Sequence, residues 1–85
     1  MGDDLDHDSV TPLYVQLAAI LRGKIERGEV TGRLPSVKGL QQEYGVAQGT
    51  AERAFAILRE EGLVTSGQGR GHFVIPPEQR APRRP

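Results

Sequence analysis

The stretch that decides the fold is GVAQGTAERAF, residues 45–55. Gly45 interrupts any preceding helix, and Val46 can fill the turn that follows with an apolar side chain. Beyond it, one set of small and apolar residues recurs at i, i+3, i+4 and i+7: Ala51, Ala54, Phe55 and Leu58. This spacing predicts an amphipathic helix over about residues 48–61, which we expect to end at Gly62.

Two further helical patterns precede this stretch. Thr11-Pro12 is typical of a helix start, with a hydroxyl cap and then proline at the first helical position. An apolar stripe follows and is expected to end at Gly28; it comprises Leu13, Leu17, Ile20, Leu21 and Ile25. A second, short helix is expected from a cap at Ser36 to about Glu43, and GEVTGRLP (28–35) before it is interpreted as a connector of turn residues.

Two short runs of strand-forming residues follow the third helix. LVT (63–65) and HFVI (72–75) flank the glycine-rich segment SGQGRG (66–71), which predicts a β-hairpin. The order of elements is therefore helix, helix, helix, hairpin. It indicates a mainly helical α+β domain.

Length and charge bound the organisation of the chain. Its 85 residues allow one small domain, and the lack of cysteine excludes disulfides and thiolate metal sites. The net charge is zero, but residues 1–10 hold four aspartates and no Lys or Arg, whereas residues 76–85 hold three arginines and one glutamate. We expect a disordered acidic arm (1–10), a mildly basic folded domain (11–75) and a disordered basic tail (76–85).

Several classes of function are disfavoured. No apolar run approaches the ~18 residues of a membrane span and no signal peptide opens the chain, so we expect a cytoplasmic protein without a membrane partner. His7 and His72 lack suitably spaced partners, which argues against a metal site. All aspartates lie in the arm and no glycine-rich nucleotide motif follows a strand, so we expect neither an enzyme nor a bound cofactor.

A series of short motifs runs through the chain in order. They are PLY (12–14), IERGE (25–29), LPS (34–36), GV (45–46), Thr50, Ala54, LREEGLV (58–64) and GRGHFV (69–74). From Pro12 to Val74 the sequence thereby resembles the N-terminal DNA-binding domain of GntR-family bacterial transcription regulators. The resemblance implies a winged helix-turn-helix with a two-stranded hairpin wing. It also implies a regulator of transcription that binds double-stranded DNA on the nucleoid.

The resemblance further implies a set of DNA-contacting positions. Lys38 matches a basic residue that meets phosphate in the family, Thr50 is kept, and the glycine-flanked arginine of the wing is Arg70. At the start of the recognition helix two family arginines are replaced by Gln48 and Glu52. The candidate DNA-binding residues are Arg33, Ser36, Lys38, Gln48, Gly49, Thr50, Glu52, Arg53, Gln68, Gly69, Arg70 and Gly71.

Gln48 and Glu52 allow two interpretations. They lie four residues apart on the exposed face, where glutamine can pair with adenine and glutamate can accept from cytosine N4, so the sequence preference could be altered. Alternatively, a carboxylate near phosphates weakens DNA binding, and adjacent Arg53 could swing outward to supply part of the missing charge. Similarly, Arg70 either enters a minor groove or is incidental to a glycine turn.

The remaining alternatives concern the whole chain. Family regulators usually continue into a C-terminal domain that binds a small effector and dimerises, whereas this chain ends ten residues after the hairpin; we expect no small-molecule effector site in it. A homodimer on DNA and a monomer are both compatible with the sequence. The alternative function is a winged-helix protein-interaction module that has lost most DNA affinity, which Glu52 and the acidic arm favour. The arm either folds over the basic face or is a solvated tail.

Overall fold

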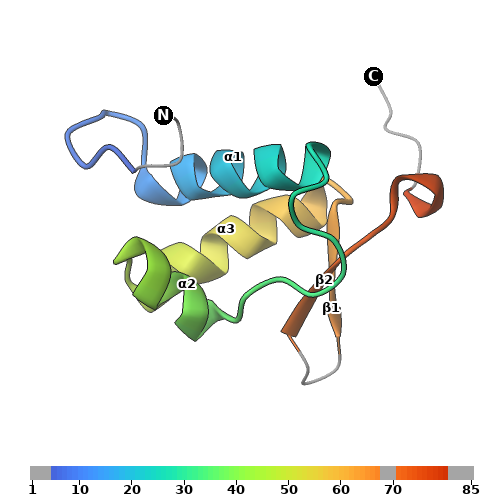
Figure 1. Ribbon diagram of the computed structural model, residues 1–85. Helices are drawn as coiled ribbons and strands as arrows, with labels where there is room; N and C mark the ends of the chain where they lie inside the picture. Colours follow the sequence, from blue (N-terminus) through green and yellow to red (C-terminus); the bar gives the residue numbers. More distant parts are fainter. Residues whose placement is uncertain (1–4, 68–70, 81–85) are drawn as a thin grey trace.

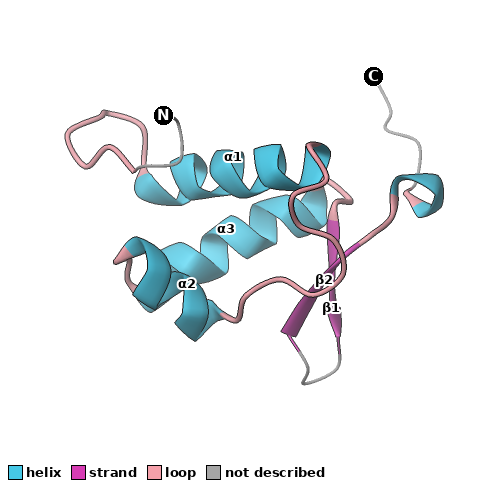
Figure 2. Cartoon of the chain, in the orientation of Figure 1, coloured by secondary structure: helices cyan, strands magenta, loops and turns pink. Residues whose placement is uncertain are grey.

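The computed structural model describes residues 5–67 and 71–80. Three helices precede a two-stranded antiparallel sheet (Figures 1 and 2): α1 (Leu13–Glu26), α2 (Val37–Tyr44), α3 (Gln48–Glu60), β1 (Val64–Gly67) and β2 (Gly71–Val74). In the sheet Val64 is paired with Val74 and Gly67 with Gly71. The mainly helical winged helix-turn-helix predicted from the sequence is confirmed.

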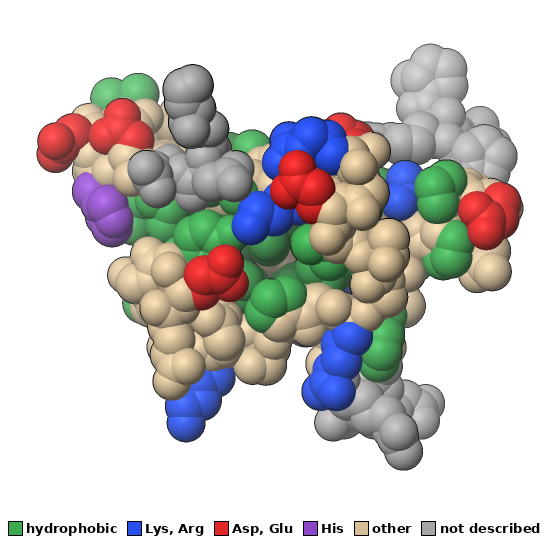
Figure 3. All heavy atoms as spheres, in the orientation of Figure 1, with side chains coloured by type: hydrophobic (Ala, Val, Ile, Leu, Met, Phe, Trp, Pro, Cys, Tyr) green, Lys and Arg blue, Asp and Glu red, His purple; other side chains and the backbone are tan. Residues whose placement is uncertain are grey.

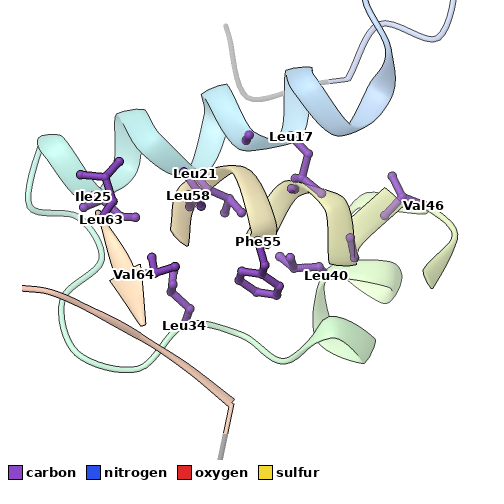
Figure 4. Packing of buried hydrophobic residues seen from close by; sticks show 13 residues of the cluster. Leu17, Leu21, Ile25, Leu34, Leu40, Val46, Phe55, Leu58, Leu63 and Val64 are labelled. Atoms are coloured by element: carbon purple, nitrogen blue, oxygen red, sulfur yellow. The ribbon is translucent and has the colours of Figure 1, made fainter. Parts of the chain in front are cut away.

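The core lies between α1 and α3 and is closed by α2 and by the base of the sheet (Figure 4). The four residues predicted for the inner face of α3, Ala51, Ala54, Phe55 and Leu58, are all completely buried. The apolar stripe of α1 packs against them, with Leu17, Leu21 and Ile25 almost fully buried. Helical periodicity therefore located the core correctly.

The turn before α3 follows from two local features. α2 begins at the predicted cap, where the Ser36 hydroxyl oxygen accepts from the Gly39 N–H at 2.9 Å. It ends at Gly45, whose φ of +67° lies in the left-handed region, and Val46 is buried beneath the turn. Only glycine adopts this conformation without steric cost, so the chain can reverse here and start α3.

The start of α1 differs from the expectation. Pro12 occupies the capping position rather than the first helical position, and among the described residues no side chain caps the helix. Instead the Gln16 side chain turns back, and its amide donates to the Thr11 carbonyl at 2.8 Å. The prediction of a Thr11 hydroxyl cap is wrong because the helix begins one residue later than the proline rule implies.

The connector before α2 (residues 28–35) also pairs with the sheet. The Leu34 N–H donates to the His72 carbonyl at 2.9 Å, and the Val74 N–H donates to the Gly32 carbonyl at 2.7 Å. Arg33 forms an antiparallel bridge with Phe73 between these bonds. Residues 32–34 therefore pair with β2 as a short extended segment and hold this strand in place. A local pattern of turn residues does not predict this pairing.

Both ends of the described chain make local contacts where the sequence predicted disorder. The Gln16 side chain donates to the Asp6 carbonyl at 2.9 Å and accepts from the Asp6 N–H at 2.7 Å, and Leu5 packs against the core. After β2, Pro77–Gln79 form a 3-10 turn, and Arg80 donates to the Ile75 carbonyl at 2.8 Å. The division into arm, domain and tail stays a prediction, and residues 1–4 and 81–85 lie outside the described residues.

Candidate DNA-binding surface

The outer face of α3 is the first part of the surface. Because Ala51, Ala54 and Phe55 face the core, Gln48, Gly49 and Glu52 are left exposed, and Thr50 is half-buried. Ala47 precedes the helix and supplies no side-chain cap within the described structure. The first backbone N–H groups of α3 are thus available to an anion such as a phosphate.

Two of the predicted residues form a pair on this face. The Gln48 side-chain amide donates to the Glu52 carboxylate, with 2.9 Å between Nε2 and Oε2. The two residues are one helical turn apart, which is the separation at which side chains on a helix meet. The structure therefore brings these two candidates together at the start of α3.

Arg53 is directed elsewhere. Its guanidinium lies over the ring of Tyr14 on α1, 5.4 Å from the ring centroid. A cation at this distance is attracted to the ring face. In this arrangement Arg53 does not share the position of the Gln48–Glu52 pair, although the sequence alone placed it beside them.

The start of α2 supplies the second part of the surface. Lys38 is exposed in the first turn of α2, and an open groove between α2 and α3 is lined by Val37, Lys38, Gln41, Gln42 and Gln48. Figure 3 shows Lys and Arg side chains projecting below α2 and beside the sheet, at the lower edge of the molecule. The Ser36 hydroxyl is already engaged by Gly39, so its contribution at this position is to cap the helix.

The sheet supplies the third part. Gly71 has a φ of +95° where β2 begins, and a side chain there would lie 3.7 Å from Nε of Arg33. The bridge between Arg33 and Phe73 thus brings a basic residue of the connector beside the wing. The predicted residues Gln68, Gly69 and Arg70 lie outside the described residues.

The structure adds a contact between α3 and the wing that the sequence did not predict. The His72 ring stacks on Phe55 with 3.8 Å between centroids and 5° between planes. Its Nε2 lies 3.1 Å from Nη1 of Arg59, so the arginine donates and the neutral ring accepts. Strand alternation places His72 on the same face as Val74, toward α3. This alternation is the sequence feature from which the contact of His72 with α3 could have been predicted.

The electrostatic state of His72 follows from this packing. Burial, and then the positive charge of Arg59, hold the pKa of His72 below its usual value. With Arg59 donating to Nε2, the ring proton resides on Nδ1, which is buried and has no hydrogen-bond partner among the described residues. The junction between α3 and the wing therefore favours a neutral imidazole.

Nowhere in residues 5–67 and 71–80 do three His, Asp or Glu side chains gather so that they could hold a metal ion. Over the same residues, every helix is too short or too polar to traverse a lipid bilayer.

The helix α3 follows a tight turn after α2 and has an exposed outer face. Lys38 at the start of α2 and the β-hairpin flank this face. This arrangement defines a winged helix-turn-helix domain of the DNA-binding class. The chain belongs to the gntR family of bacterial regulatory proteins, whose sequence profile matches residues 13–74. It is a GntR-type DNA-binding domain of a transcriptional regulator.

Individual relatives agree with this assignment. The chain is 38% identical over 76 residues to the uncharacterized HTH-type transcriptional regulator YurK of Bacillus subtilis, covering 87% of this chain and 31% of YurK. It is 40% identical over 65 residues to the mannosyl-D-glycerate transport/metabolism system repressor MngR of Escherichia coli, covering 74% of this chain and 27% of MngR. The chain therefore spans about a third or less of the length of these curated relatives.

Solved structures show the same fold. The GntR-family transcription factor YtrA of Sulfolobus acidocaldarius matches with a TM-score of 0.77 at 32% identity, over 87% of this chain and 80% of the YtrA chain. The DNA-binding domain of AraR, in complex with operator ORE1, matches with a TM-score of 0.74 at 30% identity, over 84% of this chain and 89% of that chain. The surface assembled above belongs to a fold that binds operator DNA in AraR.

Proposed function

We propose that this domain binds duplex DNA sequence-specifically and regulates transcription through that binding. The observation that carries the proposal is the exposed face of α3, set between Lys38 at the start of α2 and the wing. AraR, which shares the fold at 30% identity, has its DNA-binding domain in a complex with an operator.

In this proposal α3 enters the major groove and the flanking elements hold the DNA backbone. Gln48, Gly49, Thr50 and Glu52 face base edges or nearby phosphates. Lys38 binds a backbone phosphate beside the start of α2, where free N–H groups favour an anion. Arg33 and the segment Gln68–Gly71 accompany the wing, with Arg70 in the minor groove.

The proposal extends to the setting of the domain. The domain acts in the cytoplasm, at the nucleoid, without catalysis, cofactor or membrane partner. Residues 11–75 bind DNA and do not bind a small-molecule effector. On a palindromic operator two copies bind as a homodimer, because two-fold symmetric sites match paired recognition helices.

A second candidate function is a protein-interaction module. The observation that favours it is Glu52, an exposed carboxylate in the second turn of the helix that would face DNA phosphates. Salt distinguishes the two candidates, because binding through phosphates weakens steeply with added salt and a largely apolar protein contact does not.

The contact roles are tested by removing two basic residues together. We predict that Lys38→Ala/Arg70→Ala weakens binding to any duplex and flattens the plot of log affinity against log salt by about 0.9 for each phosphate that is no longer neutralised. Fluorescence anisotropy with a labelled duplex measures both quantities. Arg27→Ala is the control for charge alone, since it removes a single positive charge at the end of α1, opposite the edge formed by α2 and the wing (Figure 1).

Unchanged affinity and slope in the double variant would contradict the proposed contacts. Arg27→Ala removes one charge where the double variant removes two, so a decrease of about half the size in Arg27→Ala would mean that total charge, and not the placement of Lys38 and Arg70, determines binding.

A further inference from the structure

The Gln48–Glu52 pair carries an inference about which bases the domain selects; it rests on the proposed function. We propose that the two side chains act as one unit that selects adenine or cytosine, the bases with an exocyclic amino group in the major groove, and disfavours guanine and thymine. The pair lies in the first two turns of α3, the part of a recognition helix that contacts base edges.

The hydrogen bond between the two side chains fixes how the amide is turned. A carboxylate has only acceptors, so the group that Gln48 presents to Glu52 at 2.9 Å must be its NH₂ group. The amide oxygen and the second N–H of Gln48 then remain for a ligand, together with Oε1 of Glu52. Both side chains are exposed, so these groups are accessible.

The charge of Glu52 is not neutralised by the other residues of its helix. Arg53 lies over the ring of Tyr14, and Arg59 is hydrogen-bonded to His72. Neither arginine of α3 forms an ion pair with Glu52 among the described contacts. The exposed pair therefore presents an excess of acceptors and a negative charge.

The base edges differ in how they meet such a surface. Adenine offers N6–H₂ as a donor beside the acceptor N7, and cytosine offers N4–H₂, whereas guanine offers the acceptors N7 and O6 and thymine offers O4 and a methyl group. The free donor and acceptor of Gln48 match adenine, and Oε1 of Glu52 accepts from an amino group of either base. Guanine O6 or thymine O4 would face the carboxylate with no hydrogen between them.

Selection from a pool of randomised duplexes tests this preference. The wild type is expected to prefer one base pair under α3, and Glu52→Gln to lose about tenfold of that preference, because the amide adds a donor and removes the charge. Every base pair holds one adenine or cytosine, so the base that Glu52 contacts is identified by removing its amino group. Glu60→Gln is the matched control, since it makes the same change at an exposed position near the end of the helix. Its selected sequences should equal those of the wild type.

Base analogues test the amino group itself. In the selected duplex, adenine is replaced by purine or cytosine by 2-pyrimidinone, each of which lacks only the amino group. The wild type is expected to lose about tenfold in affinity, and Glu52→Gln is expected to lose much less, because the partner of that amino group is already changed.

The outcomes separate this inference from the proposed function. An equal loss of affinity for the amino-lacking duplex in the wild type and in Glu52→Gln, or an unchanged base-pair preference in Glu52→Gln, overturns the inference while salt-dependent binding to duplex DNA still supports the proposed function. Failure of the wild type and of Glu52→Gln to bind any duplex at low salt overturns both. Circular dichroism of each variant confirms that the three helices are retained.

Discussion

At the scale of single residues, His72 joins β2 of the wing to the recognition helix. Its ring lies 3.8 Å from that of Phe55, and Phe55 is completely buried at the centre of the core. The Arg59 guanidinium lies at the other edge of the imidazole. A change in the charge of His72 therefore acts on α3 and on β2 together.

We predict that His72 makes the domain less stable as the pH falls. Its pKa is lowered in the folded state by burial and by Arg59, so the unfolded chain binds more protons between that lowered value and about 6.5. The free energy of unfolding then decreases as the pH drops through this window and is unaffected by His72 above it. Urea denaturation at pH 7.5 and pH 5 measures the difference, with His72→Gln as the comparison.

A smaller decrease in stability between these two pH values in His72→Gln than in the wild type is expected. Equal decreases in both proteins would contradict the role given to His72, because the remaining carboxylates titrate alike in the two.

Individual residues also show where sequence reasoning succeeds and fails. Burial of Ala51, Ala54 and Phe55 follows from helical spacing, which is a local property of the chain. The stacking of His72 on Phe55 joins positions 17 residues apart through the hairpin register, and the contact of Arg53 with Tyr14 joins α3 to α1. Such contacts depend on packing between elements, so a pattern within one element does not predict them.

At the scale of elements, the turn between α2 and α3 sets the direction of the recognition helix. Its boundaries were predictable because Ser36 and Gly45 act within one turn of the backbone. The pairing of residues 32–34 with β2 was not, because it joins segments about 40 residues apart with no alternating pattern in the connector. Helix caps can be predicted from the sequence, whereas the pairing of a connector with a strand cannot.

Two glycine substitutions are predicted to act in opposite directions. Gly45→Ala places a Cβ at a φ of +67° and should destabilise the domain by roughly 1–2 kcal/mol. Gly49→Ala lies within α3, where a Cβ would meet no atom within 4 Å, and should be neutral or stabilise by up to about 1 kcal/mol. Urea denaturation of both variants checks the prediction, which fails if the two shifts have the same sign.

At the scale of the whole molecule, charge is separated along the chain. Four aspartates lie in residues 1–10, and the Gln16 side chain holds the backbone of Asp6 at the start of α1. Acidic side chains are visible at this end in Figure 3, away from the basic side chains beneath α2. Composition predicted the segregation, but the position of residues 5–10 depends on the specific contact with Gln16.

We predict that the aspartates of the arm weaken DNA binding at low salt. Changing Asp3, Asp4, Asp6 and Asp8 to asparagine removes four negative charges and raises the net charge from zero to +4. Affinity for duplex DNA should rise at low salt and converge on the wild-type value as salt shortens the Debye length to about 3 Å at 1 M. Anisotropy titrations over a salt series measure this. Equal affinities of the two proteins at the lowest salt would show that the arm has no electrostatic effect on binding.

The most direct test of the central claim is a titration of the wild-type chain against a labelled duplex of random sequence, by fluorescence anisotropy at low and at high salt. We predict binding at low salt that weakens steeply at high salt, because Lys38, Arg33 and Arg70 displace counterions from phosphates. Absence of binding at both salt concentrations would contradict the account and would indicate that the exposed face of α3 contacts a protein instead.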